Sequence, residues 1–105
     1  MAGNIVIKPY PSLVAVVHQM VKSAPSGLTP RSIAEFSGYT NYNTMMSELS
    51  RQPGHKLGAD MLLPLMDVCN SDAPVAFMAR EREGIFLKLQ QPAACGGELV
   101  QSQIG

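Results

Sequence analysis

Prolines and glycines divide this chain into short segments, which restricts it to short helices joined by tight turns. The 105 residues include 8 Pro and 9 Gly. The strongest of these signals surrounds one segment: Thr29-Pro30 pairs a hydroxyl N-cap with Pro at the first helical position. Gly38 follows eight residues after Pro30 and suits the left-handed position that ends a helix. The sequence therefore predicts a short helix over residues 30–37.

Apolar residues at helical spacing, each bounded by a cap or a break, predict five helices in all. The first begins at Pro11, and the third has Met45, Met46 and Leu49 directed inward. Pro64 lies within the fourth and is expected to bend it or delay its start. The predicted helices cover residues 11–23, 30–37, 41–51, 59–69 and 73–83.

Two short apolar runs at the ends of this helical block read as strands. Residues 4–8 are β-branched and closed by Pro9, and residues 85–89 alternate imperfectly. A single strand is not stable alone, so the two are expected to pair, either within one chain or across a dimer. The fold class is therefore mainly α: a five-helix domain with short N- and C-terminal β-strands. Residues 1–89 form one domain, and residues 90–105 are expected to be a flexible tail.

The second and third helices look like a helix-turn-helix. Ala34 is small enough for a close helix crossing, Gly38 permits the sharp turn, and Tyr39 fills the space beneath it. Phe36 counts among the apolar positions of the second helix, with Ile33 and Ala34. The spacing from Gly38 to the first anchor, Met45, indicates one extra residue in the turn.

The outward face of the third helix is polar, and includes Glu48. Asn pairs with adenine edges, hydroxyls bond bases or phosphates, and Tyr contacts sugars or a thymine methyl. Such a face at the start of the second motif helix is placed to enter the major groove of double-stranded DNA. Arg31 at the start of the second helix suits a phosphate, although an ion pair with Glu35 is an alternative. The predicted DNA-binding residues are Arg31, Thr40, Asn41, Tyr42, Asn43, Thr44, Ser47, Arg51, His55 and Lys56.

Several downstream stretches add a resemblance to a known family. They are Pro53-Gly54-His55-Lys56-Leu57-Gly58, Leu65-Met66-Asp67-Val68, Asn70-Ser71-Asp72 and Ala73-Pro74-Val75-Ala76-Phe77-Met78-Ala79, together with Val17-His18-Gln19-Met20-Val21 earlier in the chain. In order and spacing they resemble the phage regulatory protein CII family, over about residues 13–89. The resemblance implies a helix-turn-helix transcription regulator of temperate phages that binds DNA as an oligomer. The family's usual Asn-Lys-Leu reads Ser47-Glu48-Leu49 here, so an acidic residue replaces a basic one.

Charge and cysteine content bound the remaining possibilities. The formal net charge is zero, so one subunit offers few cations and DNA binding is expected from a dimer or tetramer. The two thiols, Cys69 and Cys95, lack metal-ligand spacing and predict a reducing, cytoplasmic location in a bacterial or phage-infected cell. No signal-like or bilayer-spanning run is evident. No catalytic, metal or cofactor motif is found, so the chain is expected not to be an enzyme.

A different function class also fits the sequence. The seven Met and the neutral charge suit a protein-binding module or anti-regulator whose Met-rich helices form a partner groove. For the DNA-binding regulator, contacts with RNA polymerase are a further expected interaction.

Overall fold

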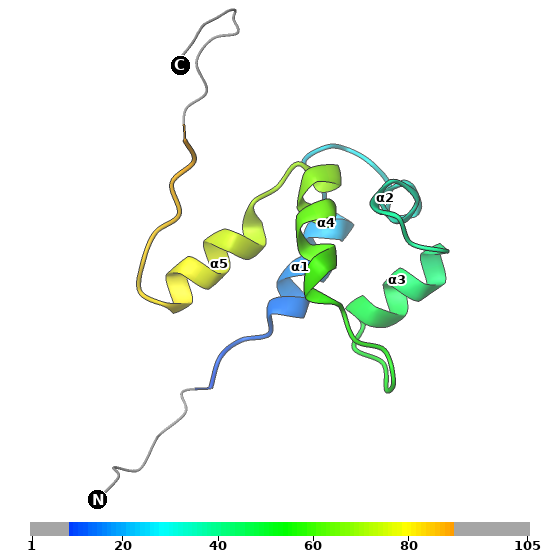
Figure 1. Ribbon diagram of the computed structural model, residues 1–105, viewed down its shortest axis with the longest axis horizontal. Helices are drawn as coiled ribbons and strands as arrows, with labels where there is room; N and C mark the ends of the chain where they lie inside the picture. The colour runs from blue at the N-terminus through cyan, green and yellow to red at the C-terminus, as the bar shows by residue number, and fades with distance from the viewer. Residues whose placement is uncertain (1–8, 90–105) are drawn as a thin grey trace, which may run out of the picture.

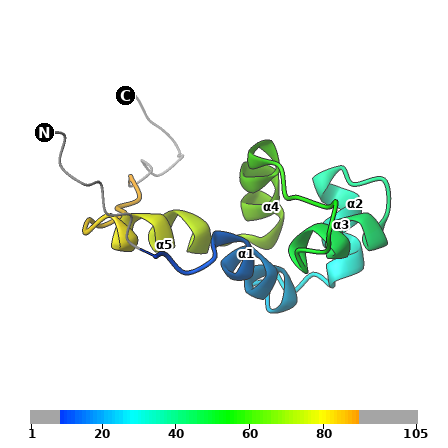
Figure 2. The same cartoon turned by 90° about the horizontal axis from the view of Figure 1, so that it is seen from below.

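The computed structural model describes residues 9–89, and these fold into five α-helices and one short 3₁₀ helix. The elements are α1 (Leu13–Lys22), α2 (Pro30–Ser37), α3 (Tyr42–Leu49), η1 (Ala59–Met61), α4 (Leu62–Cys69) and α5 (Ala73–Glu81). Helix α1 runs through the middle of the molecule and contacts α2, α3, α4 and α5 (Figure 1). Figure 2 shows α5 at the end of the molecule away from α2 and α3.

The five predicted helices are confirmed: α2 has the predicted bounds, and each of the other four is shorter than predicted. Helix α1 begins at Leu13 and not at Pro11, because the Ser12 hydroxyl accepts a hydrogen bond from the Ala15 N–H and so forms the N-cap. Pro64 delays α4 as expected: the turn before it is 3₁₀, and the proline stands in the first α-helical turn, where its missing N–H costs no hydrogen bond.

The core lies where the first four helices meet. Leu65 from α4 packs there with Val17 from α1, Ile33 from α2 and Met45 from α3, and all four are fully buried. Cys69 is also fully buried, and burial raises the pKa of its thiol. The cysteine therefore serves as a small apolar core residue.

One apolar residue of α2 does not join this core. Phe36 is 64% exposed, whereas Ile33, Ala34 and Ser37 form the buried side of the helix. At about 100° per residue, Phe36 points roughly 100° away from the middle of that side. Phe36, which the sequence grouped with Ile33 and Ala34 as an apolar position, therefore does not share their buried side.

The predicted C-terminal strand is also absent. Residues 85–89 follow α5 without regular secondary structure, so within the described residues they form no strand. The other predicted strand, residues 4–8, and the predicted tail, residues 90–105, lie outside the described residues.

Candidate nucleic-acid interface

Helix α2 has well-defined caps at both ends. At its start the Thr29 hydroxyl accepts a hydrogen bond from the Ser32 N–H at 3.2 Å, and Pro30 is the first helical residue. At its end Gly38 adopts a left-handed conformation with φ of 94°, and the Tyr39 N–H donates to the Ala34 carbonyl at 3.0 Å. This closure fixes the direction in which the chain leaves α2 toward α3.

Helix α3 is anchored to the core by Met45 and Leu49, which are buried as predicted. Its N-cap is Asn41, whose Oδ1 accepts hydrogen bonds from the Thr44 N–H at 2.8 Å and from the Thr44 hydroxyl at 3.0 Å. A two-pronged contact with adenine needs both the oxygen and the NH₂ group of an Asn side chain. Since capping occupies the Asn41 oxygen, Asn41 and Thr44 position the helix start and are poorly suited to read a base.

A cation–π contact joins the starts of the two helices. The guanidinium carbon of Arg31 in α2 lies 4.4 Å from the centre of the Tyr42 ring in α3. Such a stack orients a guanidinium while leaving most of its N–H donors available. The alternative expectation, an ion pair between Arg31 and Glu35, is not seen among the described residues.

A second side-chain contact joins the turn after α2 to α3. The Tyr39 hydroxyl donates a hydrogen bond to Glu48 Oε1 at 2.8 Å, and Tyr39 packs partly buried against the core. Burial, together with this bond, raises the pKa of the Tyr39 hydroxyl well above its usual range. Glu48 was expected on the open polar face, but its carboxylate is engaged by the turn. Its acidic charge therefore has a structural role that a sequence pattern does not reveal.

The predicted site residues fall into two groups. The first lies around the adjoining starts of α2 and α3 and continues along α3. Arg31, Thr40, Asn41 and Asn43 are exposed, and Tyr42, Thr44 and, in the second half of α3, Ser47 are half-buried. The second group lies beyond the end of α3, where Arg51, His55 and Lys56 are all exposed. None of the ten residues is buried in the core, so both groups present side chains to solvent.

The second group borders a hollow of about 400 Å³ between α1 and the loop after α3. Val14 and Leu57 contribute apolar atoms to it, and Arg51, His55 and Lys56 contribute basic groups. The loop turns at Gly54, whose φ is 81°, and the His55 N–H donates to the Gln52 carbonyl at 2.9 Å. Three basic groups thus line one hollow just beyond the end of α3.

The sequence predicted that Arg51 belongs to the third helix. In the structure Arg51 lies just beyond α3 and forms part of the closure of its end. Its φ is 57°, a left-handed conformation that is uncommon outside Gly and Asn. The Arg51 N–H donates to the Glu48 carbonyl, and the Gln52 N–H donates to the Ser47 carbonyl, each at 3.1 Å. These two bonds close the helix in a Schellman motif.

Two basic residues near this site were not predicted as part of it. His18 and Lys22 stand one turn apart on α1 and line a hollow of about 260 Å³ with Ser50 and Arg51. Partial burial, with Lys22 and Arg51 nearby, lowers the pKa of His18 below its ordinary 6.5. Their spacing of four residues predicts that His18 and Lys22 are neighbours on one side of a helix. Nothing in the sequence, however, predicts that this side of α1 lies next to Arg51.

No group of three or more potential metal ligands gathers within residues 9–89. No helix in that part of the chain is long and apolar enough to cross a membrane. No protein-family model matches the chain, and neither a curated protein nor a solved structure shows significant similarity to it.

Proposed function

We propose that this chain is a sequence-specific DNA-binding transcription regulator of the phage type, with α2 and α3 as its helix-turn-helix. The observation that carries the proposal is the Arg31–Tyr42 contact, which brings the starts of both helices to one surface. In a helix-turn-helix these two helix starts approach the duplex together: the second helix reads bases and the first meets the phosphates. The proposal agrees with the resemblance to the CII family.

Within this surface the contacts divide by chemistry. Asn43 is exposed on the first turn of α3 and has no capping bond among the described residues, so it is the best placed to read a base edge. Arg31 at the start of α2 suits a phosphate. Arg51, His55 and Lys56 suit phosphates on the adjacent stretch of the DNA backbone. Asn41 and Thr44 act indirectly, by fixing the helix start.

The neutral net charge makes oligomerisation part of the proposal. A single subunit neutralises few phosphates, and two or four copies on adjacent half-sites sum their contacts. The proposed regulator therefore acts in the cytoplasm as a dimer or tetramer on double-stranded DNA, with RNA polymerase as an additional partner.

Selection of bound duplexes from a genomic or random pool, followed by fluorescence anisotropy, tests the proposal. Asn43→Ala is expected to weaken binding to the selected site about tenfold or more, since a base contact of this kind contributes roughly 1–3 kcal/mol. Arg31→Ala is expected to weaken selected and unrelated duplexes alike, because a phosphate contact carries no sequence information.

Arg82→Ala is the matched control for Arg31→Ala, because Arg82 is also exposed but follows α5 at the other end of the molecule. It should leave the affinity unchanged. Absence of duplex binding at low salt, or equal losses in Arg31→Ala and Arg82→Ala, would contradict the proposed surface.

A protein-binding module is the second candidate, and one observation favours it. Phe36 on α2 is 64% exposed and Leu63 on α4 is 69% exposed, in a chain without net charge. Exposed apolar side chains of this size are typical of partner surfaces when they form a patch. This candidate would be supported over the first if the chain bound no duplex at low salt and bound a protein partner that the Phe36→Ser variant failed to bind.

A further inference from the structure

Arg51, just after α3, is shared by two hollows that collect basic side chains. It lines the hollow of about 260 Å³ with His18 and Lys22 of α1, and the hollow of about 400 Å³ with His55 and Lys56. Both histidines of the chain, and three of its eight lysines and arginines, therefore lie in these two hollows. Charge is thus unevenly distributed in a chain whose formal net charge is zero.

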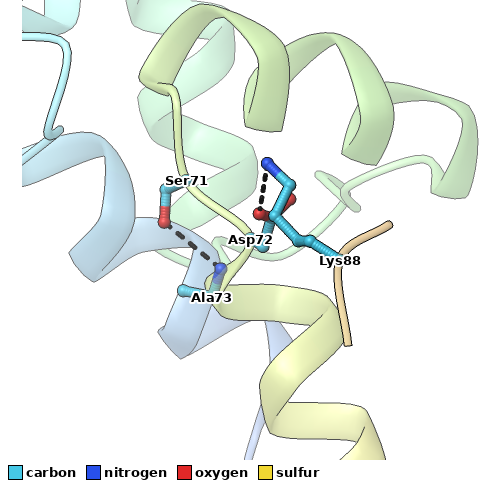
Figure 3. A network of polar contacts seen from close by, with 4 residues as sticks. All are labelled: Ser71, Asp72, Ala73 and Lys88. Atoms are coloured by element: carbon cyan, nitrogen blue, oxygen red, sulfur yellow. Dashed lines mark hydrogen bonds and ion pairs between the residues drawn. The ribbon is translucent and has the colours of Figure 1, made fainter. Parts of the chain in front are cut away.

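The cations of these hollows have no acidic partner within the described residues. The one ion pair found there joins Lys88 Nζ to Asp72 Oδ2 at 3.2 Å, near the start of α5 (Figure 3). Among the residues that line either hollow the only acid is Glu48, whose carboxylate already accepts the Tyr39 hydroxyl. Hollows lined by charges of one sign concentrate ions of the opposite sign, so this surface is suited to an anion.

His18 is the member of the cluster whose charge responds most to a bound anion. It is half-buried, whereas Lys22 and Arg51 are exposed. Partial burial and the positive charges of Lys22 and Arg51 lower its pKa, so the imidazole is mostly neutral at pH 7. Helices α2, α4 and α5 also contact α1, but within residues 9–89 they add no residue to the lining of this hollow.

The distance between this cluster and the start of α3 matches the width of a DNA groove. Helix α3 has 8 residues, so it is about 12 Å long at 1.5 Å per residue. The major groove of B-DNA is also about 12 Å wide, with a row of phosphates along each side. When Arg31 and the start of α3 meet one side of the groove, the groups just beyond the end of α3 reach the other side.

We propose that His18, Lys22 and Arg51 form a binding site for a phosphate group, which the backbone of DNA supplies. Lys22 and Arg51 donate charged hydrogen bonds to the phosphate oxygens. The bound negative charge offsets that of the two cations, so His18 takes up a proton from solvent and becomes a third donor. DNA as the source of the phosphate rests on the proposed function, whereas the site itself rests on the three basic groups.

Nuclear magnetic resonance titration of the His18 imidazole in the labelled full chain tests the site. The pKa of His18 is measured in chloride, in inorganic phosphate at equal ionic strength, and with a saturating selected duplex. The duplex should raise it by about 1 pH unit or more, the equivalent of a tenfold change in proton affinity. A rise with inorganic phosphate but not with the duplex would overturn DNA as the source. No rise with either ligand would overturn the site. If the chain binds no duplex, the proposed function fails and the phosphate titration alone decides the site.

Affinity measurements on Lys22→Ala provide a second test. This variant should weaken selected and unrelated duplexes alike, roughly three- to tenfold, and reduce the slope of log affinity against log salt concentration by about 1. Lys88→Ala is the matched control, because it removes the same charge from a residue already paired with Asp72. Equal losses in the two variants, or a loss in Arg31→Ala with none in Lys22→Ala, would overturn the site; the second result would leave the proposed function standing.

The dependence of affinity on pH tests the proton uptake. Between about pH 7.5 and pH 5.5 the native chain should gain more affinity for the duplex than His18→Gln, because only the native chain binds a proton at this position. His55 is present in both proteins, so its own titration cancels in the comparison. An equal gain in both proteins would overturn the part assigned to His18.

Discussion

Tyr39 shows how a single side chain links the turn after α2 to α3. The sequence predicted that its ring fills the space beneath the turn, and the ring is indeed packed against the core. The hydroxyl goes further, because its bond to Glu48 connects the residue after Gly38 to the last turn of α3. Periodicity places Glu48 on a polar face but cannot pair it with Tyr39 nine residues earlier. Which polar residues of α3 keep their side-chain groups free for a ligand is therefore a property of the fold.

Replacing Tyr39 by Phe should test this link. We expect Tyr39→Phe to lower the free energy of unfolding by about 1 kcal/mol at neutral pH, the usual net value of one hydrogen bond. Urea denaturation measures this. Tyr42→Phe is the control, since the Tyr42 hydroxyl has no hydrogen-bond partner among the described residues and its ring still faces Arg31.

The same residue predicts a change in stability at alkaline pH. The pKa of Tyr39 is raised above the ordinary 10.0 in the folded chain. Its contribution to stability is therefore complete below pH 10 and is lost as the pH rises through the higher folded pKa. Between neutral pH and about pH 11 the native chain should lose more stability than Tyr39→Phe. Parallel losses in the two proteins would show that Tyr39 titrates as it does when unfolded.

At the scale of elements, helix ends set the geometry of the proposed interface. Four helices end in the same closure, with a left-handed residue at Gly38, Arg51, Asn70 or Glu83. Gly38 and the Asn70 cap region are evident in the sequence because Gly and Asn favour this conformation. Arg51 and Glu83 carry no such signal, so the ends of α3 and α5 were predicted too late.

Gly38→Ala should be destabilising through the backbone alone. An added Cβ meets no atom within 4 Å, so only the left-handed φ of 94° opposes it. That conformation costs an L-residue about 1–2 kcal/mol, and we expect the free energy of unfolding to fall by this amount. Gly58→Ala is the control, because its φ is −75° and its Cβ also meets nothing. Comparable losses at both glycines would contradict the account of the turn.

Arg51→Gly and Glu83→Gly form a matched pair. Both remove a left-handed L-residue, and each should raise the free energy of unfolding by about 1 kcal/mol. Only Arg51→Gly removes a proposed phosphate contact, so it alone should reduce the affinity for duplex DNA. Because fewer phosphates are then neutralised, the affinity should also depend less steeply on salt concentration. If Arg51→Gly is more stable and binds DNA as well as the native chain, Arg51 has no part in the interface.

For the molecule as a whole, the sequence predicted the positions of the helices better than the contacts between them and the structure of the segment after α5. Caps, prolines and helical spacing are local signals, and they placed five helices and the anchors Met45 and Leu49 correctly. The proximity of Arg31 to Tyr42, and of His18 to Arg51, depends on how helices pack and has no local signal. Residues 85–89 were predicted as a strand from composition, but a strand also needs a partner, which the described residues do not supply.

The central claim is that the starts of α2 and α3 form one surface that enters a DNA groove, and amide chemical-shift mapping tests it most directly. Titration of the labelled chain with a selected duplex should produce its largest shifts at Arg31, Ser32 and residues 40–44, with smaller shifts at residues 51–56. Helix α5, at the far end of the molecule, should be unaffected except where copies of the chain associate. Shifts confined to α4 and α5, with residues 40–44 unchanged at saturation, would contradict the account.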